Sequence, residues 1–201
     1  MAVDERVTCE QVDRALIHYP SITPGPRPVL RRGTVHLVTT PRDRDAAGRA
    51  RNARPRDASG RPLPRGAAEG VERVPDDLVL TPDEAVTRAQ ELLDAGRPFT
   101  AHEVLEGAWK AADEPDRELW RALAQLAVGL THAQRGNARG AVALLDRGAG
   151  NLARWVGPVP AGLDVRGLLA HADALARRIE RDGLAGITER DLSLHLREGA
   201  V

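Results

Sequence analysis

Residues 116–145, DRELWRALAQLAVGLTHAQRGNARGAVALL, decide the fold class of this chain. In the first part of this stretch leucine and alanine recur at spacings of four and three, the period of an apolar face on an α-helix. Gly136 and Asn137 then end that helix and start another, because glycine suits a helix C-terminus and asparagine an N-cap. The stretch therefore predicts two packed helices, over about 116–135 and about 138–155.

Two glycines, Gly140 and Gly148, fall inside the second of these helices. A glycine in a helix interior costs about 1 kcal/mol relative to alanine. We expect the close approach of another helix backbone to compensate for this cost.

Helix signals continue on both sides of the stretch. Upstream, Thr81 and Glu84 form a capping-box pattern, and Gly96 ends the helix that follows. Thr100 and Glu103 repeat the pattern and predict a second N-cap at Thr100. Downstream, a further apolar face is bounded by an N-cap and a glycine stop, at Asp164 and Gly183.

The amino-acid composition of the segment before these helices differs from that of the helical region. Four of the five aromatic residues lie between positions 99 and 155, whereas residues 41–70 contain eight arginines, four acidic residues and one large aliphatic side chain, Leu63. Such a stretch buries too little apolar surface to offset its ordering entropy, so we expect it to be mobile unless it drapes over the helical domain. A short helix within 8–18 and a strand within 34–39 are predicted further upstream, but two isolated elements do not build a core.

The sequence thus predicts an all-α fold, a compact bundle of about five helices with a flexible Arg-rich N-terminal extension. The expected boundaries are a largely irregular or disordered extension over 1–76, the helical domain over 77–183 and a C-terminal tail over 184–201, whose structure the pattern leaves undecided.

Charge and cysteine content exclude several classes of function. The chain has 29 basic and 29 acidic residues, so it has no net charge to attract nucleic acid or an anionic membrane. Cys9 is the only cysteine, which excludes an internal disulfide and a cysteine-based zinc site. No stretch has the pattern of a signal peptide or a membrane span, and we expect a soluble, cytoplasmic protein.

Two blocks carry a resemblance to a known family. The first is FTAHEVLEGAWK, residues 99–110, and the second is LAQLAVGLTHAQRGNARGAVALL, residues 123–145. They resemble the bacterial and archaeal family known as domain of unknown function 309, whose hallmark is the pattern HxxxExxW. The matching residues are His102, Glu106 and Trp109 in the first block and Gln125, His132, Asn137, Gly140 and Ala141 in the second. The resemblance implies a small helical domain and no particular reaction. Residues 48–66 also look like the segment before this domain in actinobacterial sequences.

Helical spacing places this motif at the edge of the core. Positions 102, 106 and 109 are four and three residues apart, so they share one face of a helix, and we expect His102 and Glu106 to be half-buried. Gln125 and His132, seven residues apart, share a face of the next helix.

Three interpretations of this cluster are open. In the first, the polar side chains form a structural network that holds the helices together, and no cofactor is needed. In the second, His102, Glu106 and His132 bind a divalent metal such as zinc, although HEVLE has Glu106 where the zinc-protease motif HExxH has its second histidine. In the third, His102 and Glu106 act as an acid–base pair without a metal, with no nucleophile close by.

The favoured interpretation is a non-enzymatic interaction or scaffold module with a protein partner or a second copy of itself. The alternative is a metal-dependent hydrolase-like enzyme that uses His102, Glu106 and His132. The arginines of residues 41–70 could contact phosphates, but they lack aromatic interleaving and are diluted by acidic residues, so a solvated linker is favoured over nucleic-acid binding. The remaining histidines share no spacing, and the sequence assigns no role to His18, His36, His171 and His195.

Overall fold

The computed structural model describes residues 55–64, 66–68, 70–71, 74–75 and 78–198. All described residues belong to one compact unit, 54–201. The helix predicted within 8–18 and the strand predicted within 34–39 lie outside the described residues.

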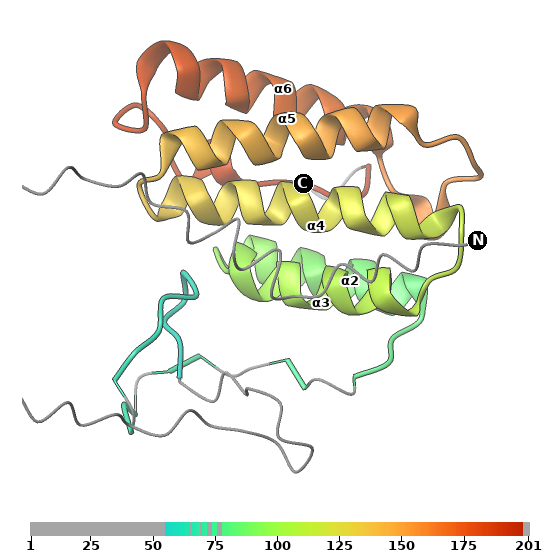
Figure 1. Ribbon diagram of the computed structural model, residues 1–201, viewed down its shortest axis with the longest axis horizontal. Helices are drawn as coiled ribbons and strands as arrows, with labels where there is room; N and C mark the ends of the chain where they lie inside the picture. The colour runs from blue at the N-terminus through green and yellow to red at the C-terminus, as the bar shows by residue number, and fades with distance from the viewer. Residues whose placement is uncertain (1–54, 65, 69, 72–73, 76–77, 199–201) are drawn as a thin grey trace, which may run out of the picture. The chain divides into compact units, whose positions relative to one another are not determined.

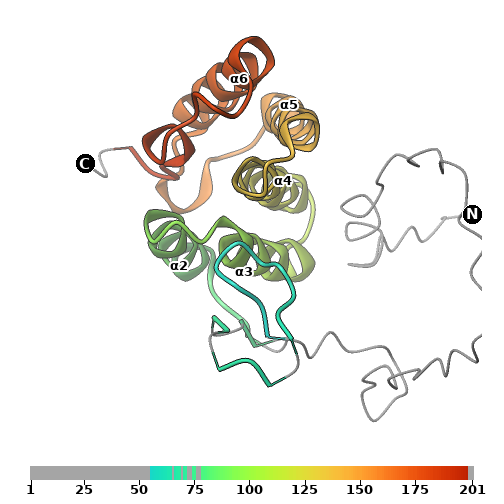
Figure 2. The same cartoon turned by 90° about the vertical axis from the view of Figure 1, so that its left-hand side faces the viewer.

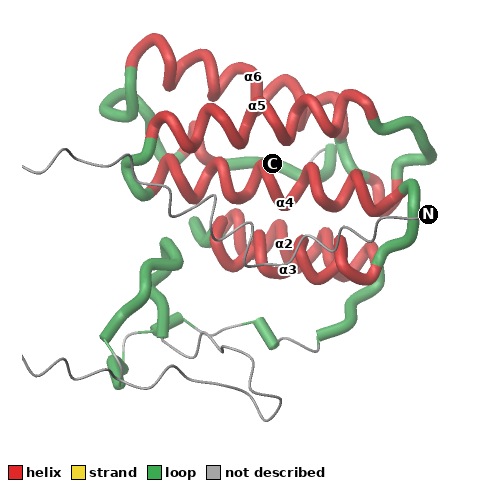
Figure 3. The backbone as a smooth tube through the Cα atoms, viewed as in Figure 1, coloured by secondary structure: helices red, strands yellow, loops and turns green. Residues whose placement is uncertain are grey.

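The described residues fold into α-helices joined by loops, which confirms the predicted all-α bundle (Figure 3). They contain no β-strand, only isolated bridges of Arg56 with Pro62 and of Leu163 with Arg197. None of these helices is long and apolar enough to cross a membrane. The helices are α2 (Pro82–Asp94), α3 (Pro98–Ala111), α4 (Asp116–Gln134), α5 (Ala138–Arg154) and α6 (Val165–Asp182), with short 3-10 helices η1 (Pro160–Gly162) and η2 (Arg190–Leu192).

Each α-helix packs against the next one along the chain. Figure 1 shows α4 lying between the α2–α3 pair and α5, with α6 beyond α5. Seen end-on in Figure 2, the helices form an arc from α2 to α6 whose open side is closed by the C-terminal segment. We call residues 190–197 the C-terminal strap. Its Leu194 and Leu196 are buried in the core, so the tail that the sequence left undecided completes the bundle.

Local capping signals set most helix ends as predicted. Thr81 and Glu84 form the capping box of α2, in which the Glu84 N–H donates to Thr81 Oγ1 and the Thr81 N–H donates to Glu84 Oε2. Asn137 caps α5 and Asp164 caps α6 through their side-chain oxygens. Gly183 ends α6 with φ of +70°, a conformation that favours glycine.

The predicted cap at Thr100 is wrong. Helix α3 begins at Pro98, its N-cap is Arg97, and no side chain caps it. Proline is pre-organised for the first helical position, so Pro98 starts the helix before Thr100 is reached. Thr100 then lies in the first turn, where it is 3% exposed.

Close approach of α4 and α5 explains two glycines. A Cβ added to Gly148 would lie 2.7 Å from Leu126 Cδ2 and 3.1 Å from the main-chain oxygen of Ala122. A Cβ added to Gly129 would lie 2.9 Å from Leu145 Cγ. The expected compensation for Gly148 is therefore confirmed, since a larger residue at either position would push the two helices apart.

Part of the Arg-rich segment packs on the helical domain. Gly60 lies against the ring of Phe99, close enough that a Cβ there would collide with it. The guanidinium groups of Arg56 and Arg135 lie 5.0 Å and 5.3 Å from the centre of the same ring. Arg135 Nε donates to the Ser59 carbonyl at 2.8 Å. These contacts fix the described residues 55–63 over the start of α3 and the end of α4.

Candidate functional site

His102 and Glu106 form a buried pair on α3. The distance between His102 Nε2 and Glu106 Oε2 is 3.7 Å, and the Lys110 ammonium lies 2.9 Å from Glu106 Oε1. The two residues are only 7% and 6% exposed, so the predicted half burial was too shallow. The Phe99 ring, one turn earlier, contributes to this burial, because its centre lies 6.1 Å from that of His102 and Gly60 covers it in turn.

Trp109 extends the same face of α3 by one turn. It is 7% exposed, and the guanidinium of Arg117 lies 5.5 Å from its ring centre. A cation over an indole face is attracted by the ring electrons. Trp109 thus lies buried at the end of this face, near the turn between α3 and α4.

His132 lies near the end of α4 in a network that fixes its protonation. Its Nδ1 is 2.7 Å from Asn137 Nδ2, and the Asn137 side-chain oxygen accepts a hydrogen bond from the Gly140 N–H at 2.9 Å. Since that oxygen is engaged by an N–H group, the amide nitrogen of Asn137 must be the donor to His132. The neutral His132 ring therefore carries its proton on Nε2.

Gly140 belongs to this network because it has no side chain. A Cβ at this position would collide with both His132 Nδ1 and Asn137 Nδ2. We expected the backbone of another helix to approach Gly140 closely, and this prediction is wrong. The close neighbours are the side chains that join the end of α4 to the start of α5.

Burial keeps His132 neutral. The residue is 5% exposed, and its pKa is lowered from the ordinary 6.5 first by burial and then by the positive charge of Arg135. Nε2 is buried and has no hydrogen-bond partner among the described atoms. The site therefore contains a neutral imidazole with one N–H group free to donate.

Gln125 is bonded to α5. Its side-chain oxygen accepts a hydrogen bond from Asn151 Nδ2 at 2.8 Å, and Asn151 also accepts one from Arg154. The polar and aromatic residues of the motif are thus distributed over a His–Glu pair on α3, a tryptophan beside Arg117, and two cross-links from α4 to α5: His102, Glu106, Trp109, Gln125, His132 and Asn137. Sequence reasoning missed Asn151, whose spacing in α5 carries no signal until the register of α4 against α5 is known.

The metal interpretation requires His102, Glu106 and His132 to converge on one ion. Within the described ranges, no group of three or more histidine, cysteine, aspartate or glutamate side chains is arranged to hold a metal. A ligating nitrogen must also be unprotonated, whereas Asn137 donates to Nδ1 and leaves the proton on Nε2. For Nε2 to bind a metal, Asn137 would have to turn its amide and abandon the Gly140 N–H. With the Asn137 hydrogen bond in place, neither ring nitrogen of His132 offers a free lone pair to an ion.

Comparison with known proteins identifies the domain. Residues 86–144 match the family model described as Domain of unknown function (DUF309). The match runs from α2 into α5 and spans all the residues that carry the resemblance, which supports the assignment of this part of the chain to that family. No curated protein and no solved structure matches the chain.

Proposed function

We propose that this DUF309 family member is a non-enzymatic interaction or scaffold module whose His102, Glu106 and Trp109 cluster is structural. The observation that carries the proposal is the Asn137–His132 hydrogen bond, which is possible only because Gly140 leaves room for it. The bond orients the histidine to support the helix junction and gives its ring a tautomer unsuited to metal binding.

The other polar contacts support the same interpretation. Gln125 and Asn151 tie α4 to α5, and Glu106 lies between the His102 ring and the Lys110 ammonium. Buried polar groups that satisfy one another specify a single packing, since each unpaired group would cost about 1–3 kcal/mol. The network is thus suited to a rigid domain that presents a fixed surface.

A protein surface is the partner that we propose, either another protein or a second copy of this chain. Among the residues that the structure describes, four large apolar side chains stay exposed in the loops before α2 and after α5, including Val79 at 82% and Val156 at 86%. The balanced charge of the chain gives nucleic acid or a membrane no general attraction. The absence of a second cysteine is in keeping with a cytoplasmic location.

A metal-dependent hydrolase is the alternative, because a buried histidine beside a carboxylate can also serve chemistry. The two functions predict different results for a variant that lacks the His102 side chain. A structural cluster predicts that His102→Ala lowers the melting temperature and that no metal accompanies the native protein. A hydrolase predicts a near-stoichiometric metal that is lost in a variant that remains folded.

The test is elemental analysis of the full chain, purified without chelator or affinity-tag metal, together with melts of the variants. Gly140→Ala should destabilise the domain by about 1–3 kcal/mol, because it separates Asn137 from His132. Gly150→Ala is the matched control, since the nearest atom to its added Cβ is Arg154 Nη1 at 3.6 Å. This control should be neutral or up to about 1 kcal/mol more stable, from helix propensity alone. Bound metal together with a Gly140→Ala variant as stable as the control would reject the structural interpretation.

A further inference from the structure

The C-terminal strap is attached to α6 by polar contacts at its start. Arg178 of α6 pairs with the Asp191 carboxylate and donates to the Gly186 carbonyl at 2.9 Å. Asp191 also accepts hydrogen bonds from the Thr188 N–H and hydroxyl, both at 2.7 Å. The start of the strap is therefore a defined turn resting on the second half of α6.

Further along, the strap is attached to α2 and to the start of α6. The Gln90 side chain of α2 donates to the Leu194 carbonyl at 3.2 Å and accepts from the Leu196 N–H at 2.6 Å. The Asp164 N–H donates to the Leu196 carbonyl at 2.8 Å. Leu194 and Leu196 fill the space between the two helices and are 2% and 0% exposed. The strap thus covers an apolar gap where α2 and α6 make little direct contact.

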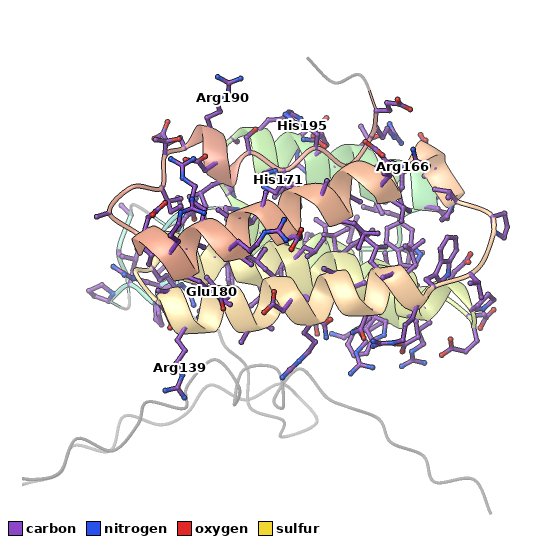
Figure 4. All side chains as sticks on the ribbon, turned by 90° about the horizontal axis from the view of Figure 1, so that it is seen from above. Arg139, Arg166, His171, Glu180, Arg190 and His195 are labelled. Atoms are coloured by element: carbon purple, nitrogen blue, oxygen red, sulfur yellow. The ribbon has the colours of Figure 1, made fainter. Side chains whose placement is uncertain are left out.

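A pair of histidines lies across the seam between the strap and α6. Figure 4 shows His171 on α6 beside His195 of the strap. His171 is partly buried and donates a hydrogen bond to the Asp191 main chain, while its Nε2 has no hydrogen-bond partner among the described atoms. Burial lowers the pKa of His171 below 6.5, the charge of His195 lowers it further, and Asp191 opposes both through its charge and its main-chain bond.

The other neighbours of His171 supply little compensating charge. The buried residues of α5, the helix packed against α6, are apolar: Ala141, Leu145, Gly148 and Leu152. On α6 itself, Arg178 already shares the Asp191 carboxylate. Towards the other end of the strap, Arg197 pairs with Asp83 at 2.6 Å. In Figure 4 Arg190 projects away from the bundle. Asp191 is therefore the one acidic group, within the described part of the chain, that acts on His171.

We propose that the C-terminal strap is an acid-released latch. Protonation of His171, which lies beside His195 at the seam, adds a positive charge next to one carboxylate that is already shared with Arg178. The strap then leaves α6 and uncovers the apolar gap that Leu194 and Leu196 fill. This inference does not depend on the proposed function of the motif cluster.

The direction of the effect follows from the two states of the strap. When the strap is detached, His171 regains solvent and binds a proton at its ordinary pKa of 6.5. When the strap is docked, the pKa is lower, so the detached state binds more protons in the range below that value. Docking is therefore complete above about pH 6.5 and weakens as the pH falls below it.

Hydrogen exchange of the full chain tests the latch. Protection factors, which are corrected for the intrinsic pH dependence of exchange, are compared for peptides of the strap and of α4. Between about pH 8 and about pH 5, protection of the strap should fall at least about tenfold more than that of α4. In His171→Gln, which keeps an N–H donor for the Asp191 main chain and cannot be protonated, the extra loss should disappear.

Equal loss in the strap and α4, or the same extra loss in His171→Gln, would overturn the latch. A second variant, His195→Gln, keeps the test independent of folding, since His195 is exposed. Titration of the His171 ring by NMR should show its pKa rising in this variant, because the neighbouring positive charge is gone. An unchanged His171 titration would remove His195 from the latch and contradict the proposed pair.

Discussion

The α4–α5 hairpin and the C-terminal strap both bury leucines completely, and different contacts hold them. In the hairpin, Leu126 is 0% exposed and Gly148 lets the two helices approach closely. Each helix satisfies its own backbone hydrogen bonds, so side chains join the pair, through apolar packing and the two side-chain hydrogen bonds described above. In the strap, Leu196 is equally buried, but its N–H and C=O are bonded to Gln90 and Asp164.

This difference separates global from local stability. Loss of packing between α4 and α5 removes the centre of the arc and separates the α2–α4 side of the bundle from α6. Loss of a strap contact frees an extended segment whose backbone water can then solvate. We therefore expect the strap to open below the free energy of global unfolding, and the hairpin to open only with the whole domain.

The largest expected effect comes from deleting one fully buried leucine in each region. Leu126→Ala should reduce the free energy of unfolding by about 2–5 kcal/mol, since a cavity is left between two rigid helices. Leu196→Ala removes the same atoms and should reduce the free energy of unfolding by less. Once the strap has detached, the substitution has no further effect, so the loss cannot exceed the free energy of docking the strap. Urea denaturation gives the global cost, and hydrogen exchange of the strap gives the local one.

The two leucine variants are controls for each other. If Leu196→Ala unfolded the domain as fully as Leu126→Ala, with α4 and the strap losing protection together, the strap would be part of the cooperative core and the comparison would fail.

Much of the fold could be predicted because its signals are local. The Thr81–Glu84 box, the Asn137 cap and the Asp164 cap each lie within three residues of the group they bind. Thr100 failed for a local reason too, since Pro98 offers a better first position two residues earlier. Where two start signals overlapped, the proline prevailed.

The strap and the partners of the motif could not be predicted in this way. Gln90 and Leu196 are 106 positions apart, and a glutamine on a helix gives no sign that it will bind an extended segment. The His102–Glu106 pair followed from helical spacing. The His132–Asn137 bond crosses a turn, and neither the cap signal nor the family resemblance of Asn137 shows that it binds His132. The positions of His171 and His195 in the sequence follow no helical or strand periodicity, and only the folded strap brings them together.

An intermediate effect is expected from Gln90. Its side-chain amide bonds the main chain of the strap at Leu194 and Leu196, as a neighbouring strand would in a sheet. Gln90→Leu leaves the Leu196 N–H and the Leu194 C=O without their protein partner, at a cost of about 1–3 kcal/mol if both stay buried. The cost should appear as faster exchange in residues 192–197, with α4 and α5 unaffected. Gln134→Leu is the matched control, because Gln134 is exposed and makes one hydrogen bond, to the Gly96 carbonyl at 3.0 Å. Equal exchange in the two variants would mean that the strap is held by its leucines alone.

The smallest effect concerns the first turn of α2, to which the end of the strap is attached through Asp83. Thr81→Ala removes the side-chain cap and should reduce the free energy of unfolding by about 1 kcal/mol. The same change has a signature at Glu84, whose pKa is lowered from 4.5 by hydrogen bonds from the Thr81 main chain and hydroxyl. Without the hydroxyl, the pKa of Glu84 should rise towards its ordinary value in an NMR titration.

Because the pKa of Glu84 is lower in the folded state, the stabilisation it adds is present above about pH 4.5 and is lost as the pH falls. Acid should thus loosen the α2 attachment of the strap at lower pH than its seam with α6, where His171 titrates. If Thr81→Ala left both the Glu84 titration and the exchange of the strap unchanged, the end of the strap would be held by Arg197 independently of the α2 cap. The strap would then have two separate attachments, and only the histidine seam would respond to pH.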